Sequence, residues 1–216
     1  MRLLVLAAAV LATGCVSVQN RPLTDAAATS LSGADIARTS RERPSFSAMT
    51  AGKAAFGMLG AAAMISAGND VVTNNNIEDP AHKIADALLS AIAEKHGAEV
   101  VEQRVETDSG KPADVVRNTP SSTRFVLDVQ TINWSFGYFP TDWNSYRVMY
   151  SAKAQLLERS TGKVVAEGFC SRVPEATEDA PSHETLLADN AAVLKRELNL
   201  AADECIATLK ATMLRI

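Results

Sequence analysis

The three cysteines, Cys15, Cys170 and Cys205, are the residues of this sequence with the widest range of possible chemistry. A thiol can carry a lipid, can be oxidised to a disulfide, or can bind a metal as its thiolate. No two of these cysteines have the spacing of paired ligands in a zinc site. Cys15 differs from the other two because it directly follows the small residues 12–14, Ala-Thr-Gly.

The residues before Cys15 have the pattern of an export signal. Arg2 supplies a positive charge, and the apolar run 3–11 is too short to span a bilayer as a helix. Ending in Ala12-Thr13-Gly14-Cys15, this leader resembles the signal peptide and lipobox of bacterial lipoproteins, with Ala12 where Leu is usual. The resemblance covers residues 1–14 and the cysteine that follows them. It implies cleavage before Cys15, a diacylglyceryl thioether on its sulfur and usually a third acyl chain on its amine.

That resemblance also implies a location. Several acyl chains make a stable membrane anchor, whereas a single chain holds a protein only reversibly. The mature protein is therefore expected to be anchored through Cys15 and to face the periplasm. An Asp after the cysteine would favour the inner membrane, so Val16 favours the outer membrane. In this oxidising compartment we expect a Cys170–Cys205 disulfide, with two buried free thiols as the alternative.

The sequence contains no established catalytic pattern. It lacks a Gly-x-Ser-x-Gly elbow, a phosphate-binding loop and a His-Glu-x-x-His motif. His82 and His96 have no partners at metal-binding spacing, and His183 fits the first turn of a helix capped by Ser182. The net charge of −4 comes without a basic block, which disfavours nucleic acid as a partner. We therefore expect a protein that is not an enzyme and binds no metal, cofactor or nucleic acid.

Aromatic residues concentrate between positions 133 and 144, in a chain with few aromatics elsewhere. At the tip of a hairpin, such side chains either form a contact surface or pack back onto the sheet. Trp and Tyr also suit the headgroup region of a membrane. The residues predicted to bind a partner are Trp134, Phe136, Tyr138, Phe139 and Trp143.

Composition and apolar spacing predict how the chain is organised. Residues 15–45 lack periodicity and are rich in Ser, Thr, Arg and Pro, which predicts a flexible tether. Residues 46–68 are rich in Gly and Ala and predict a helix, either buried in the core or lying on a membrane or a partner. Asp79-Pro80 begins a second helix that Gly97 ends. Residues 46–216 are expected to form one domain.

The remaining segments predict strands and one long helix. Strands are expected near residues 98–105, 124–134, 144–159 and 163–173, the last three as an antiparallel meander. From His183 to Leu214, apolar residues recur at spacings of three and four, which predicts a helix lying across the sheet. Its expected apolar stripe is Leu187, Ala191, Leu194, Leu198, Ala201, Cys205, Leu209 and Met213.

The predicted fold class is α+β: a four-stranded, mainly antiparallel sheet with a long C-terminal helix and one or two N-terminal helices packed on it. The predicted function is a lipid-anchored envelope protein that binds a protein partner in assembly or transport, through the aromatic hairpin or the Gly/Ala helix. A carrier of a lipid or other apolar ligand is one alternative. A hydrolase without a recognisable motif is another.

Overall fold

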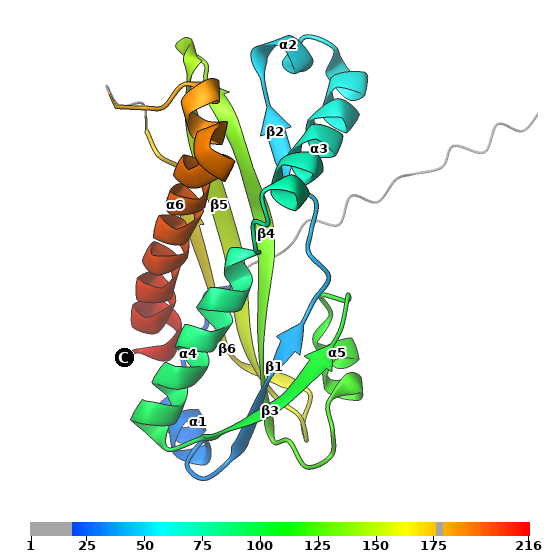
Figure 1. Ribbon diagram of the computed structural model, residues 1–216. Helices are drawn as coiled ribbons and strands as arrows, with labels where there is room; N and C mark the ends of the chain where they lie inside the picture. Colours follow the sequence, from blue (N-terminus) through cyan, green and yellow to red (C-terminus); the bar gives the residue numbers. More distant parts are fainter. Residues whose placement is uncertain (1–18, 176–178) are drawn as a thin grey trace, which may run out of the picture.

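The computed structural model describes residues 19–175 and 179–216, so the leader and Cys15 lie outside the described residues. A six-stranded mixed sheet runs through the molecule in the order β3-β1-β4-β5-β6, and β2 pairs separately with β4. Helices α4 and α6 cover one face of this sheet, and α3 lies beside β2 (Figure 1). The prediction of an α+β fold with a long C-terminal helix is confirmed. The prediction of four mainly antiparallel strands is wrong in detail.

Three long strands form the predicted antiparallel meander. They are β4 (Phe125–Phe139), β5 (Asp142–Glu158) and β6 (Lys163–Arg172). The β4–β5 hairpin is continuous from Phe125 opposite Glu158 to Phe139 opposite Asp142, with two irregularities in register. Alternate side chains point to opposite faces of a strand, so one side of the meander faces α4 and α6. The other side is partly covered by α5, whose Val115 packs with Val126 and Leu157.

Three shorter strands add parallel pairing that the sequence did not predict. They are β1 (Asp35–Ser40), β2 (Ser47–Met49) and β3 (Glu99–Glu106). Strand β1 lies between β3 and β4 and is parallel to both, and β2 is parallel to the far end of β4. The segment predicted to be a flexible tether therefore supplies a central strand. The four middle residues of β1 are all buried, so no alternation marks it in the sequence.

The helices are α1 (Asp25–Ser30), α2 (Ala51–Ala54), α3 (Gly57–Asn74), α4 (Pro80–His96), α5 (Pro112–Asn118) and α6 (His183–Leu209), followed by a π-helical turn (Lys210–Leu214). The predicted limits of α4 are confirmed, because the Asp79 side chain accepts from the Ala81 amide and Gly97 adopts a φ of 71°. None of the helices in the described ranges has the length and hydropathy needed to cross a bilayer.

Helix α6 packs on the sheet along most of the predicted stripe, with one change of phase. Residues 189–191 have positive φ, which interrupts the α-helical rotation. Leu186 is consequently buried in the first turn, whereas the predicted Leu187 is only partly buried. Beyond this break, Leu194 through Met213 follow the predicted spacing into the core.

The predicted disulfide is present between β6 and α6. The Cα atoms of Cys170 and Cys205 are 5.3 Å apart, and their sulfurs are bonded. Close approach of the helix depends on Gly168, because a Cβ there would lie 2.8 Å from Leu209 Cδ2 and 2.9 Å from Met213 Cβ. The face of β6 that carries small residues thus packs tightly against the apolar stripe of α6.

Candidate functional site

The most exposed of the large apolar side chains lie where α2 leads into α3. Phe56, Met58 and Leu59 are 73%, 92% and 81% exposed, and Ile65 continues along the same helix at 43%. No charged residue occurs between positions 54 and 67. We call these four residues the α3 patch. Such a contiguous apolar surface is typical of a contact site rather than of a free surface.

Helix α3 is attached to the rest of the protein along a narrow stripe. Its buried residues, Gly60, Met64, Gly68 and Val72, recur every fourth position. A Cβ on Gly68 would lie 2.1 Å from the Phe46 carbonyl oxygen, so only glycine lets the helix approach the β2 backbone this closely. The predicted helix 46–68 is instead β2, α2 and the first part of α3. Its interpretation as a helix buried in the core holds only for this stripe. The uncharged face beyond it is exposed.

Three of the five aromatic residues predicted to bind a partner are instead part of the core. Trp134, Phe136 and Phe139 are 2%, 0% and 3% exposed. Trp134 Nε1 donates to the carbonyl oxygens of Pro44 and Ser45, at 3.2 and 3.1 Å. Trp134 and Phe136 face the helices and pack against Phe46, so they hold the connection between β1 and β2 rather than a partner. Phe139 instead lies under the Arg147 guanidinium, 5.0 Å from its ring centroid.

Tyr138 and Trp143 are the predicted aromatics that remain accessible. Trp143 is 65% exposed, and its ring centroid lies 6.2 Å from that of Tyr138. With Met49, Gly137 and Met149, among others, they line a shallow groove of about 430 Å³ at the end of the hairpin. Gly137 alternates with the core residue Phe136 along β4, so this groove opens on the sheet face opposite the helices.

A second hollow, of about 450 Å³, lies where the chain leaves the sheet between β1 and β2. Its floor contains Asp79, whose Oδ1 accepts from the Ala81 amide at 2.9 Å and from Thr131 Oγ1 at 2.5 Å. The Tyr150 hydroxyl lies 2.9 Å from Thr131 Oγ1. Burial raises the pKa of the Asp79 carboxyl, and the Thr131 hydrogen bond opposes that shift. Asp79 thus serves as the cap of α4 and as part of a buried polar chain.

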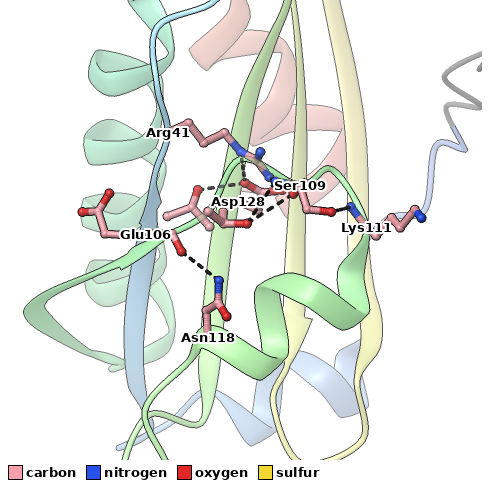
Figure 2. A network of polar contacts seen from close by, with 8 residues as sticks. Arg41, Glu106, Ser109, Lys111, Asn118 and Asp128 are labelled. Carbon is pink, nitrogen blue, oxygen red and sulfur yellow. Dashed lines mark hydrogen bonds and ion pairs between the residues drawn. The ribbon is translucent and has the colours of Figure 1, made fainter.

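An ion pair closes one side of this hollow. Arg41 donates to both carboxylate oxygens of Asp128, each at 2.8 Å, and also to the Ser109 carbonyl oxygen at 2.8 Å. Thr39 Oγ1 donates to the same carboxylate. Figure 2 shows Arg41 extending from the connection after β1 across to Asp128 on β4. These contacts join three separate segments, and both carboxylate oxygens of Asp128 accept hydrogen bonds.

No catalytic constellation is assembled from the histidines. His183 lies against the rings of Phe136 and Tyr146, with centroid distances of 5.7 and 5.3 Å. Burial lowers the pKa of His183, with a smaller contribution from the charge of Lys53. Within residues 19–175 and 179–216, no group of three His, Cys, Asp or Glu side chains is placed to hold a metal ion.

Comparison with known proteins gives distant similarity in fold. No family model and no curated protein sequence matches this chain. It is similar to the PelC dodecamer from Paraburkholderia phytofirmans, at 15% identity over 93% of this chain and 99% of that one, with a TM-score of 0.41. It is also similar to the lipoprotein GNA1162 from Neisseria meningitidis, at 16% identity over 81% and 98%, with a TM-score of 0.34. These values define no family for the chain.

The sequence predicted the Gly/Ala helix as one possible contact surface but did not identify the residues of the α3 patch, although it contained their signal. Exposed helices normally carry charged residues on their solvent side, and the stretch 54–67 carries none on any side. That pattern is shared by buried helices, so the sequence alone left both interpretations open. The Gly60 and Gly68 contacts distinguish them, because they limit packing to one stripe.

Proposed function

We propose that this chain is a lipid-anchored protein of the bacterial envelope, without catalytic activity, that binds a protein partner through the α3 patch. The observation that carries the proposal is the exposure of Phe56, Met58 and Leu59 on an uncharged helix. Full burial of one such side chain contributes about 1.5 to 3 kcal/mol, so three together can drive association. An apolar, helix-sized surface on another protein has the matching chemistry.

Two features of the packing favour this function over an apolar carrier between sheet and helices. The contacts at Gly168 bring the C-terminal part of α6 and the turn after it directly against β6, which leaves no space for a ligand at this point. The hollows beside Asp79 and along β6 are lined largely by polar and charged side chains rather than by the apolar walls of a lipid site. The groove at Trp143 is more apolar, but it is shallow and open.

The hydrolase alternative receives less support from the geometry. Asp79 is a buried acid beside a hydroxyl, yet it caps α4 and accepts from Thr131. A general base needs a lone pair directed at a reacting group, whereas this oxygen already has two donors. A role in binding therefore accounts for the exposed residues, and a role in catalysis does not.

Site-specific photocrosslinking in cells tests the partner. A photoreactive residue replaces Met58, and the control places it at Glu94, an exposed position on α4. We expect one protein adduct of defined mass from position 58 and none from position 94. Adding Leu59→Asp should abolish that adduct, because a charge at the centre of an apolar contact is costly to bury. Capture of lipid alone, or equal capture from both positions, contradicts the proposal.

The anchor is tested separately. Cells labelled with radioactive palmitate should incorporate label into the wild-type protein and none into Cys15→Ser, which should also leave the membrane fraction. If Cys15→Ser still sediments with membranes, either its uncleaved leader or the α3 patch, rather than the lipid, holds the protein there. An unlabelled wild-type protein would remove the envelope location altogether.

A further inference from the structure

We propose that the sheet face opposite α4 and α6, on which the short helix α5 also packs, lies toward the bilayer that holds acylated Cys15, so that the α3 patch faces away from this bilayer. The inference rests on the lipid anchor of the proposed function. The relevant surface, which we call the open face, comprises Met49, Met149, Lys153, Phe169 and Ser171, together with Trp143 at the hairpin end.

The described chain joins the fold from the open face. The backbone of Arg21 exchanges two hydrogen bonds with that of Glu167, each of 2.8 Å, at the free edge of β6. Two residues earlier, the Gln19 amide donates to the Glu167 carboxylate at 3.0 Å. This carboxylate also accepts from Gln155 and pairs with Lys153, whose positions alternate with those of the core residues Ala152 and Ala154. Gln19 therefore lies on the side of the sheet away from the helices.

The length of chain outside the structure then limits the distance to the membrane. Only residues 16–18 separate Cys15 from Gln19. At no more than about 3.5 Å per residue, these four steps reach roughly 14 Å. A tether ending at residue 45 would have left the domain free to turn in any direction. The observed attachment at Gln19 instead keeps this part of the open face close to the lipid surface.

The charges around Gln19 suit an anionic lipid surface. Arg21, Lys153 and Lys163 line the same hollow as Gln19, and Glu167 is the one acid among its lining residues. Lys153 Nζ lies 3.3 Å from the Glu167 carboxylate, so this pair is neutral as a unit and two cations remain. Each Lys or Arg close to an anionic membrane strengthens attachment to that surface.

Farther along the open face, the exposed side chains suit the headgroup region. Trp143 is 65% exposed and Val173 is 53% exposed, and Met49 is 37% exposed. Tryptophan is favoured at the membrane interface because its ring is apolar and its N–H is polar. The open face thus combines cations near the attachment point with apolar groups toward the hairpin end.

Helix α3 lies on the opposite side of the sheet. Gly68 contacts the backbone of Phe46 and Ala48, and the side chains of these two residues belong to the core on the helix side. The residues of the α3 patch lie outside the buried stripe of that helix. A bilayer against the open face would therefore leave the α3 patch accessible to a partner approaching from the aqueous side.

Lipid photocrosslinking tests the orientation on the full lipidated chain in vesicles of phosphatidylethanolamine and phosphatidylglycerol. Photoreactive residues replace Ser171, an exposed position on the open face, and Met58, at 92% exposure in the α3 patch. We expect lipid adducts from position 171 at least tenfold above those from position 58. Adducts mainly from position 58, equal adducts from both, or none from either overturn the orientation.

A spectroscopic measurement gives an independent readout without a photoreactive residue. Brominated lipids should quench the fluorescence of Trp143, and Trp143→Phe should lose this quenching because the remaining Trp134 is buried. Combining Arg21→Glu with Lys163→Glu should reduce it by at least half. No quenching in a protein that still carries palmitate overturns the orientation and leaves the anchor intact. A protein without palmitate would instead contradict the proposed function.

Discussion

Arg41 binds Asp128 through two hydrogen bonds of 2.8 Å, and this ion pair fastens the connection between β1 and β2 to the middle of β4. The two side chains are only 11% and 4% exposed. At this point β4 has no neighbouring strand on that side, because β1 pairs with residues 125–127 and β2 with residues 135–137. The hydrogen bonds between Arg41 and Asp128 take the place of backbone pairing with a neighbouring strand at this point.

Removing one partner of this buried pair should be strongly destabilising. Asp128→Ala leaves the Arg41 guanidinium without its carboxylate, and we expect the free energy of unfolding in urea to fall by about 3 to 5 kcal/mol. The control is Asp203→Ala, which breaks the exposed pair with Lys83 and should cost less than about 1 kcal/mol. Combining Arg41→Met with Asp128→Leu should recover much of the loss. A single-variant effect no larger than the control would contradict the role given to this pair.

The contact between α3 and β2 should tolerate no side chain at Gly68. A Cβ there would lie 2.1 Å from the Phe46 carbonyl oxygen, so Gly68→Ala must displace the helix or the strand. We expect a loss of about 1 to 3 kcal/mol and faster hydrogen exchange in α3. Gly52→Ala is the matched control, since nothing lies within 4 Å of that position. This control should be neutral or slightly stabilising, and equal effects at both sites would refute the packing argument.

The buried Asp79 carboxyl should make stability depend on pH in an identifiable way. Burial raises its pKa in the folded protein above the ordinary value of 3.8, so the folded state disfavours its ionisation. Its contribution to stability is therefore fully present below pH 3.8 and is lost as pH rises through the higher folded-state pKa. Asp79→Asn keeps an acceptor for Thr131 and Ala81 but cannot ionise. We expect its stability relative to wild type to increase with pH.

Urea unfolding at several pH values between about 4 and 7 measures this effect. Asp70→Asn, at an exposed position in α3, serves as the control and should show the same pH dependence as the wild type. If Asp79→Asn and the wild type change in parallel across this range, burial of the carboxyl has no thermodynamic consequence.

The disulfide between β6 and α6 should contribute substantially to stability. Its two cysteines are separated by 35 positions, for which the chain-entropy model gives roughly 3 to 4 kcal/mol. Replacing both with Ser should lower the thermal midpoint, and mass analysis of the unreduced wild-type chain should find it lighter than the dithiol by two hydrogen atoms. A mass equal to that of the dithiol would show that the bond does not form in the cell. Replacing both with Ala separates loss of the bond from the burial of a hydroxyl.

The sequence by itself determined the elements that carry their own local signals. Asp79 and Gly97 define the ends of α4, because a cap and a left-handed residue act within one turn. Alternation identified the meander, since one of its faces is packed and the other is more open. The pairing of Cys170 with Cys205 followed from there being only two cysteines after Cys15.

The features that depend on residues far apart in the sequence were determined only by the tertiary structure. Strand β1 is buried on both faces, and its Arg38 is accommodated by Asp86 of α4, so nothing local marks it as a strand. Trp134 and Phe136 are buried because Phe46 packs against both rings, a neighbour nearly ninety positions away. The α3 patch is exposed because glycine contacts confine the attachment of its helix to one stripe. Burial depends on which residues pack against a segment in the folded protein, so the sequence of that segment alone does not determine it.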